Sequence, residues 1–301
     1  MSAPIPVIEG RIPFRGYETW YRIVGDAEEP GKWPVLALHG GPGVPHDYLE
    51  PLEALAATGR RVIFYDQLGC GNSDQPHDPS LWTVALFVAE VAAIRAALGL
   101  ERVHLLGQSW GGMLAMEYAL TQPAGLQSLM IESSPASMTQ WVAEANRLRE
   151  ALPPDVQRTL LTHEADSTTD DPAYEEAMMV FYERHVCRLA EWPDCVTRSF
   201  DKLSDNPEVY YTMNGPSEFH VTGNLKTWDI TERLGEIRVP TLVLSGRYDE
   251  ATPAIHETVH RGIRGSASVI FEHSAHMCHL EEPEAFLRAV GDFLVRVETG
   301  G

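Results

Sequence analysis

The sequence predicts an α/β fold, in which a mostly parallel central sheet carries helices on both faces and a helical cap is inserted between two of its strands. Short apolar runs that end in glycine-rich turns recur along the chain, and such runs are typical of strands buried on both faces of a parallel sheet. Helical patterns separate these runs, except over residues 138–235, where no buried strand is visible. The chain has 301 residues, of which 44% are hydrophobic and 22% charged, so it can form one large core and an insertion.

The first third of the chain alternates strands with one clear helix. Residues 5–14 and 18–24 are predicted to form a hairpin. A later helix carries Phe87 and Leu98 on one apolar face and ends near Gly99, a residue type that commonly terminates helices. The predicted buried strands of the whole chain are residues 35–38, 61–65, 103–106, 126–131, 241–245 and 268–271.

Further helices are predicted over residues 109–120 and, at the end of the chain, over about 283–297. Residues 138–235 read as helical and polar, with 18 acidic and nine basic side chains. We therefore predict a core domain formed by residues 1–137 and 236–301, and a cap domain formed by residues 138–235. The cap is expected to lie over the C-terminal edge of the sheet.

The charge balance excludes several classes of partner. Lysine and arginine number 23 against 43 acidic residues, which gives a net charge of −20. This balance argues against nucleic acid or an anionic membrane as the main partner.

No uncharged apolar stretch of about 18 residues occurs, so no transmembrane helix is expected. Residues 1–7 lack the basic and apolar regions of a signal peptide, and the sequence does not indicate an oligomeric state.

The four cysteines indicate a reducing compartment. Their spacing matches neither a zinc site nor a dense disulfide framework. Cys187 and Cys195 could meet in space, but reduced thiols in a cytoplasmic protein are the expectation. The cysteines are Cys70, Cys187, Cys195 and Cys278.

The segment 107–111 reads Gly-Gln-Ser-Trp-Gly and carries the strongest chemical signal. It follows a predicted buried strand and opens a helix, which is the context that turns the G-x-S-x-G pattern into a nucleophile elbow. The flanking glycines permit a sharp turn at which side chains would clash. The turn would project the hydroxyl of Ser109 above the sheet, beside a helix N-terminus that stabilises negative charge.

The glycine-rich segment His-Gly-Gly-Pro-Gly at 39–43 ends an earlier strand. A loop of this composition lets main-chain amides approach a ligand. The amides of Gly41 and Trp110 are therefore candidates for an oxyanion hole that binds a tetrahedral intermediate.

A nucleophilic serine needs a base, and the base needs a carboxylate to orient it. In chain order the carboxylate comes next, and Asp249 stands in the loop after the strand 241–245. His276 follows the last predicted strand and is the preferred base, with His273 and then His279 as alternatives. None of the twelve histidines forms an H-E-x-x-H pattern, so neither a metal nor a cofactor is expected.

These motifs resemble those of the α/β-hydrolase superfamily. Within it they are most similar to the proline iminopeptidase-like serine aminopeptidases, in particular the subgroup of the tricorn-interacting aminopeptidase. The resemblance covers nearly the whole chain and implies the α/β-hydrolase fold. It is carried by residues 39–43, 66–74, 107–112, 215–219 and 246–249.

The resemblance also implies a site for the free amino group of the substrate. In that family, glutamates of the cap and of the acid loop hold this group, and the matching residues here are Glu218 and Glu250. A buried ammonium requires a carboxylate partner, because leaving it unpaired costs several kcal/mol. The alternatives are a solvated cap residue for Glu218 and a loop salt bridge for Glu250.

A pocket for proline would need apolar walls. The candidates are Trp110 beside the nucleophile and the cap aromatics Tyr210, Tyr211 and Phe219. Aromatic residues of a helical cap also serve packing, so this assignment stays open.

The predicted function is that of a serine aminopeptidase of proline iminopeptidase type. It would act through an acyl-enzyme on a small peptide or amino acid amide with a free N-terminus. An amidase for L-amino acid amides would use the same machinery. An esterase or lactonase would ignore the amine, and a non-enzymatic ligand receptor on the same scaffold would lack part of the triad.

Overall fold

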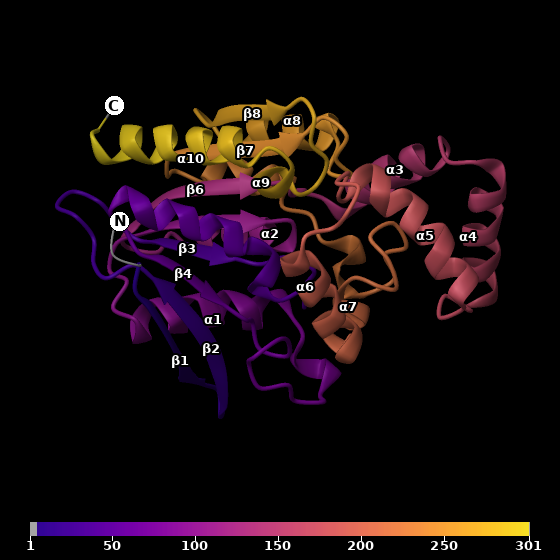
Figure 1. Cartoon of the computed structure of the whole chain (residues 1–301), viewed down its shortest axis with the longest axis horizontal. Coiled ribbons are helices and arrows are strands. Elements are labelled where there is room, and N and C mark those ends of the chain that lie inside the picture. Colours follow the sequence, from indigo (N-terminus) through magenta and orange to yellow (C-terminus); the bar gives the residue numbers. More distant parts are fainter. Residues whose placement is uncertain (1–4, 301) are drawn as a thin grey trace.

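The computed structural model describes residues 5–300 (Figure 1). Residues 1–4 lie outside this range, and they belong to the segment 1–7 that is not expected to be a signal peptide. Eight strands form one sheet in the order β1-β2-β4-β3-β5-β6-β7-β8. β1 and β2 run antiparallel to each other, and β2 runs antiparallel to β4, whereas the remaining neighbours are parallel. The strands are β1 (Val7–Phe14), β2 (Tyr17–Val24), β3 (Val35–Leu38), β4 (Val62–Tyr65), β5 (Val103–Gln108), β6 (Leu126–Glu132), β7 (Thr241–Gly246) and β8 (Ala267–Phe271).

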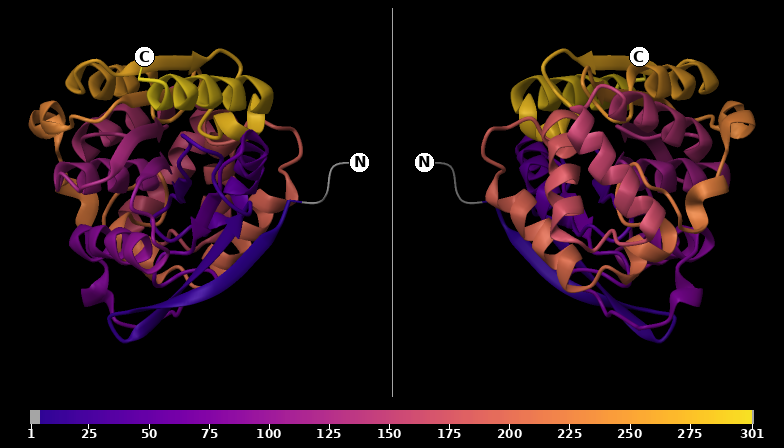
Figure 2. Two further views of the ribbon diagram at one scale, coloured as in Figure 1. Left: turned by 90° about the vertical axis from the view of Figure 1, so that its left-hand side faces the viewer. Right: turned by 90° about the vertical axis from the view of Figure 1, so that its right-hand side faces the viewer.

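The predicted hairpin is confirmed, and all six runs predicted as buried strands are strands of the sheet. The prediction of burial is wrong for the last of them, because β8 lies at the edge of the sheet and only its Phe271 is buried. Every residue of β3, β4, β5 and β7 is buried, as expected for central strands of a parallel sheet. The antiparallel hairpin of β1 and β2 lies at one end of the sheet, where Figure 2 shows it as a long ribbon along the edge.

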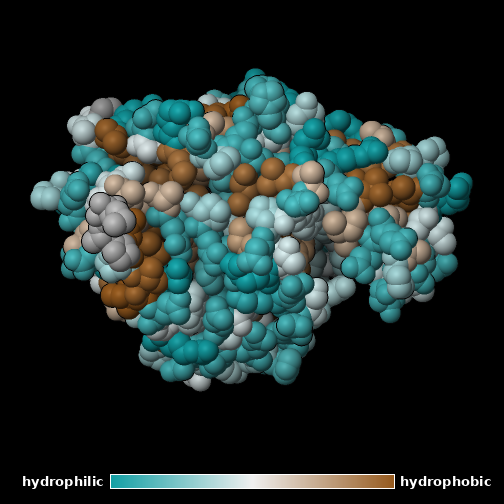
Figure 3. Space-filling model, viewed as in Figure 1, coloured by the Kyte–Doolittle hydropathy of each residue, from teal (hydrophilic) through white to brown (hydrophobic). Residues whose placement is uncertain are grey.

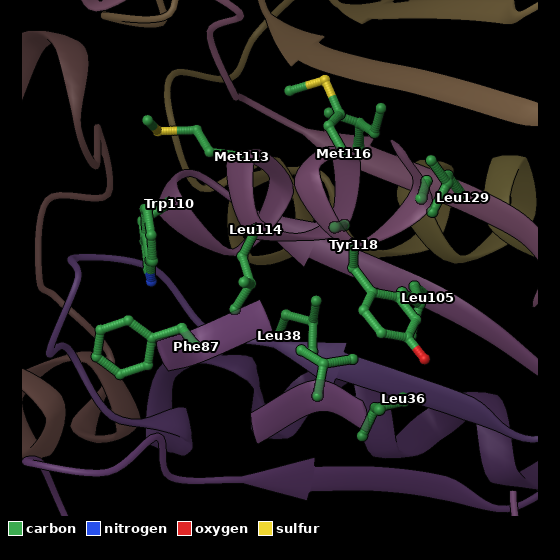
Figure 4. Close-up of a cluster of buried hydrophobic side chains, with 14 of the residues drawn as sticks. Leu36, Leu38, Phe87, Leu105, Trp110, Met113, Leu114, Met116, Tyr118 and Leu129 are labelled. Atoms are coloured by element: carbon green, nitrogen blue, oxygen red, sulfur yellow. The ribbon is translucent and has the colours of Figure 1, made fainter. Parts of the chain in front are cut away.

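Helices cover both faces of the sheet, and successive residues of β3 contact different layers. Leu36 and Leu38 belong to a hydrophobic cluster with α1, α2 and α8, whereas Val35 and Ala37 belong to a second cluster with α10. Figure 4 shows the first cluster, in which side chains of α2 pack onto the sheet. These helices are α1 (Val84–Ala97), α2 (Trp110–Leu120), α8 (Pro253–Gly262), α9 (Cys278–Glu281) and α10 (Pro283–Glu298).

A helical segment that the sequence patterns did not indicate completes the second layer. The 3₁₀ helix His46–Thr58 follows β3 and packs against α10 and β4. Its Tyr48, Leu49, Leu52 and Leu55 are buried in the second cluster. Shorter 3₁₀ helices are Pro79–Leu81, Asn224–Thr227 and Thr231–Glu236.

The inserted segment between β6 and β7 is helical, as predicted, and lies beyond the carboxyl ends of the strands (Figure 1). Its two ends meet, because Ser137 and Asp229 form an isolated β-bridge. The segment after this bridge, Thr231–Glu236, packs against α8 of the core. We call the helices of the insertion the cap, and they are α3 (Met138–Arg149), α4 (Pro154–Asp166), α5 (Pro172–His185), α6 (Asp194–Asp205) and α7 (Glu208–Met213).

The described residues bear on the cysteines and on membrane spans. All four cysteines are free, so Cys187 and Cys195 form no disulfide. No helix within residues 5–300 is both long and apolar enough to cross a bilayer.

Candidate active site

The nucleophile elbow is formed by the turn between β5 and α2. Ser109 has a positive φ of 55°, a strained conformation that side chains seldom adopt. The glycines around it are required sterically, because a β-carbon on Gly107 would overlap the Gly111 carbonyl and one on Gly111 would overlap the Leu38 carbonyl. The Ser109 amide donates to the carbonyl of Glu132 at 2.9 Å, which ties the turn to the end of β6.

Asp249 and His276 meet across 27 residues of chain, and His276 Nδ1 lies 2.8 Å from Asp249 Oδ1. The carboxylate is fixed by other donors, since the Ala251 amide donates to Oδ1 at 2.7 Å and the Ser245 hydroxyl to Oδ2 at 3.1 Å. Both side chains are buried. With Nδ1 protonated, the other ring nitrogen, Nε2, is free to accept a proton.

Ser109 and His276 line the same small cavity. Across residues 5–300, however, the Ser109 hydroxyl makes no hydrogen bond to His276, and Glu250 Oε1 lies 3.7 Å from His276 Nε2. Hydrogen bonds between nucleophile and base are often long in unliganded enzymes and shorten in the substrate complex. The arrangement is compatible with an acyl-transfer triad.

The charges around His276 favour its protonated form. Burial by itself opposes protonation of the imidazole, but the Asp249 carboxylate at hydrogen-bond distance outweighs it, with Glu218 and Glu132 adding to the effect. The pKa of His276 is therefore raised above its ordinary value of 6.5.

The two candidate oxyanion donors lie at the same cavity system. Gly41 has a φ of 104°, which only glycine adopts without strain, and it lines the small cavity together with Ser109. Trp110 N is the first amide of α2, where an amide has no intrahelical acceptor. Among the described residues, neither amide has a hydrogen-bond acceptor. Both are thus available to bind an oxyanion.

The two glutamates implied by the resemblance also reach this cavity. Glu250 is fully buried, and neither of its carboxylate oxygens has a hydrogen-bond partner among residues 5–300. Burial and the nearby charges of Glu218 and Asp249 raise its pKa well above the usual 4.5. Glu218 accepts a hydrogen bond from the Tyr210 hydroxyl at 2.6 Å, and burial raises its pKa as well. A buried, unpartnered carboxyl is costly unless a cation or a donor occupies the cavity.

The four candidate wall residues occupy different places in the described structure. Trp110 lines a second small cavity that shares Ser109 and Glu218 with the first, and Tyr210 binds Glu218. Phe219 lines neither small cavity and packs inside the cap against Phe181, with ring centroids 4.9 Å apart.

Tyr211 is 49% exposed and lines neither small cavity, but it lines a larger groove in the cap. Trp141 was not anticipated as a wall residue. Its ring stands edge-on to His276 at a centroid distance of 5.9 Å, and it lines the second cavity.

The alternative bases occupy other places. His273 is exposed. His279 is buried, but its Nδ1 lies 2.8 Å from Glu132 Oε1 and its Nε2 lies 3.0 Å from the Tyr48 carbonyl oxygen. It therefore connects the end of β6 to the 3₁₀ helix that contains Tyr48.

A hydrogen-bonded pair that sequence reasoning missed joins the three catalytic loops. The Tyr48 hydroxyl accepts from the Gly40 amide and donates to Gln108 Oε1, both at 2.7 Å. Gln108 Nε2 in turn donates to the carbonyl of His276 at 3.0 Å. Gln108 lies inside the elbow motif and could have been noticed, whereas nothing in the sequence around Tyr48 indicates its role.

One group of potential metal ligands occurs among the described residues, formed by His46, Asp47 and Glu50. Its carboxylates already form ion pairs with α6, Asp47 with Lys202 and Arg198, and Glu50 with Arg198. It lines neither of the small cavities around Ser109. We assign no metal to it.

Comparisons with known proteins agree with this geometry. Residues 34–283 match the model of the alpha/beta hydrolase fold family. The chain is 42% identical over 292 residues to a proline iminopeptidase of Lactobacillus crispatus, covering 96% of this chain and 98% of the relative. It is similar to the crystal structure of VinJ, with a TM-score of 0.94, 46% identity and coverage of 96% and 99% of the two chains. The proline iminopeptidase of Mycobacterium smegmatis superposes with a TM-score of 0.91 and 43% identity, covering 97% and 99%.

Proposed function

This chain belongs to the alpha/beta hydrolase family and, within it, to the proline iminopeptidases. From that premise we propose how its residues release an N-terminal residue from a peptide, with proline favoured. The enzyme is a serine aminopeptidase that acts through a covalent acyl-enzyme. The roles of individual residues below are our proposal, and the geometry of the site supports them.

In the first half-reaction, the Ser109 oxygen attacks the carbonyl carbon of the N-terminal residue. His276 Nε2 accepts the hydroxyl proton, and Asp249 holds the imidazole in the required tautomer and stabilises its charge. The amides of Gly41 and Trp110 donate to the oxyanion. When the C–N bond breaks, His276 returns the proton to the departing amine, and the acyl group stays on Ser109.

In the second half-reaction, water attacks the acyl-enzyme. His276 accepts a proton from the water and then delivers it to the Ser109 oxygen as the C–O bond breaks. The free amino acid leaves, and the enzyme returns to its starting state. No step requires a group beyond the side chains and amides described here.

The observation that carries the aminopeptidase function is the unpartnered, buried carboxyl of Glu250 in the cavity of Ser109 and His276. A substrate ammonium placed between Glu250 and Glu218 would satisfy these oxygens and lower the pKa of both carboxyls back toward normal. An acylated amine brings no charge, so both carboxyls would stay uncompensated. This arrangement favours substrates with a free N-terminus.

We further propose that residues 138–235 act as a cap domain that supplies Glu218 and closes the site. The cap is attached to the catalytic loops, since the His276 amide donates to the Val186 carbonyl at 3.1 Å and the Glu250 amide to the His185 carbonyl at 3.2 Å. The free cysteines fit a reducing compartment such as the cytoplasm.

The proposal is tested by hydrolysis of three compounds: proline β-naphthylamide, its N-acetylated form and a p-nitrophenyl ester. The enzymes compared are wild type, Glu250→Gln and a control variant, Glu272→Gln. Glu272 is an exposed glutamate paired with Arg247 outside the cavity, so its variant makes the same chemical change elsewhere. Loss of a buried ion-pair partner costs about 3–5 kcal/mol, so kcat/KM of Glu250→Gln should fall roughly 150- to 5000-fold for the free amine. The control should match wild type.

Cleavage of only the free-amine compound, with this loss in Glu250→Gln, supports the aminopeptidase. Equal turnover of the blocked amide and the ester, unaffected by Glu250→Gln, would refute it and leave a general esterase.

A further inference from the structure

A groove in the cap opens next to the active site, and the reaction as described leaves it without a role. It has a volume of about 430 Å³, which lies in the range of pockets that hold drug-sized ligands. In Figure 3 a recess separates the lobe of α4 and α5 from the body of the molecule on this side. The groove and the active-site cavity share four lining residues, and these are Val44, Tyr182, Phe200 and Glu218.

The walls of the groove are largely apolar. One face of α5 contributes Met178 and Met179, and α6 contributes Phe200 and Leu203 from the opposite side, with Trp192 between the two helices. These side chains are only partly buried. Methionine side chains adapt to ligands of different shape, and aromatic walls bind extended apolar chains.

The rim of the groove is acidic and carries no compensating charge. Asp170, Asp171, Glu175 and Asp201 line it, and all four are exposed. Within the described part of the chain, none of them forms an ion pair, and no lysine, arginine or histidine lines the groove. An anionic ligand would therefore meet repulsion from several carboxylates.

The placement of the amine site determines which part of a substrate can enter the groove. The amine is held at Glu218 and Glu250, and the carbonyl must lie at Ser109. The two cavities around Ser109 are small, so the acyl portion they accept is a single compact residue. The chain beyond the scissile bond must leave this space, and the groove adjoins it through Tyr182 and Phe200.

We propose that the cap groove binds the leaving-group portion of the substrate and takes an extended, apolar chain without negative charge. This inference rests on the proposed aminopeptidase function, since it assigns the second half of the same substrate. The groove is then a specificity site: its apolar walls select for the residues after the scissile bond, and its rim selects against acidic ones.

The inference is tested with three substrates, prolinamide, Pro-Leu-Leu-amide and Pro-Glu-Glu-amide. The initial rate of proline release is measured for each. Burial of one leucine-sized side chain corresponds to a gain of roughly 10- to 100-fold, so kcat/KM for Pro-Leu-Leu-amide should exceed that for prolinamide by about this factor. Pro-Glu-Glu-amide should be the poorest of the peptides, and its disadvantage should shrink at high salt, because salt screens exposed charges.

Two variants locate the effect. Met179→Asp places a charge in the apolar wall, and Leu161→Asp makes the same kind of change at an exposed position of α4 outside the groove. The ratio of kcat/KM for Pro-Leu-Leu-amide over prolinamide should fall at least fivefold in Met179→Asp and stay at the wild-type value in Leu161→Asp. The double variant Asp170→Asn/Asp201→Asn alters only exposed side chains, and it should improve Pro-Glu-Glu-amide.

The outcomes separate the two proposals. If no proline compound is cleaved, the proposed function itself fails. If prolinamide is cleaved but Pro-Leu-Leu-amide is no better, or if Leu161→Asp lowers the ratio as much as Met179→Asp, the groove does not bind the leaving group and the inference is overturned. An unchanged rate on Pro-Glu-Glu-amide in the double variant would overturn the role of the rim.

Discussion

Replacing Tyr48 by phenylalanine should impair both the stability and the catalytic rate of this enzyme. The Tyr48 hydroxyl is buried and bridges the Gly40 amide and Gln108 Oε1, at 2.7 Å each. Burial raises its pKa well above 10, so the hydroxyl stays neutral and keeps donating to Gln108 over the whole working pH range. Phenylalanine fills the same space without making either hydrogen bond.

The expected magnitude follows from the two groups that lose their partner. A buried donor or acceptor left unsatisfied costs about 1–3 kcal/mol, so Tyr48→Phe, which leaves two such groups, should lose roughly 2–6 kcal/mol of unfolding free energy. For a chain of this size, about 2 °C of Tm corresponds to 1 kcal/mol, which gives a decrease of about 4–12 °C. The Gly40 amide adjoins the oxyanion donor Gly41, so a shift of this loop should lower kcat about 10- to 100-fold with little change in KM.

Tyr65→Phe is a matched control, because Tyr65 is equally buried but its hydroxyl has no hydrogen-bond partner among residues 5–300. Scanning calorimetry and steady-state kinetics on proline β-naphthylamide should show Tyr65→Phe at or above wild-type Tm with unchanged kcat. The reasoning is refuted if both variants behave alike. It is also refuted if Tyr48→Phe loses Tm but keeps full kcat, since the bridge would then be merely structural.

Three further predictions concern titratable groups. Asp249→Asn should lower kcat roughly 10⁴-fold and leave Tm near wild type, because the imidazole would lose its orienting carboxylate; a loss below tenfold would contradict the triad. His276 must be neutral to accept a proton and its pKa is raised, so the acidic limb of the kcat/KM profile should lie above pH 6.5 and move to lower pH in Glu218→Gln. Burial raises the pKa of Glu90 to about 8, so the folded protein favours the protonated carboxyl. The stability that this carboxyl contributes is fully present below pH 4.5 and is lost as the pH rises through 8. Glu90→Gln should therefore unfold at a higher temperature than wild type at pH 9 but not at pH 5, and a lower Tm at pH 9 would contradict this.

The amino-acid sequence by itself predicted the layout of the core and the identity of the triad candidates. Apolar runs bounded by glycine mark strands buried on both faces, and each one became a strand of the sheet. The turn at Ser109 is likewise encoded locally, because Gly107 is needed where the backbone of the same turn comes close, at the Gly111 carbonyl. Such features depend on residues close together in the chain, so the sequence displays them directly.

The tertiary structure alone decided how the cap meets the core. Glu218 and Glu250 reach one cavity because the cap turns back over the sheet, and sequence reasoning paired them only through a family resemblance. Tyr48 contacts Gln108 across 60 residues, a convergence that no local pattern records. The same holds for Phe219, an aromatic cap residue that packs against Phe181, while Tyr210, nine positions earlier, binds Glu218 and lines the cap groove. Local patterns specify which face of a helix is apolar, but only the packing of helices against one another decides which side chains come together.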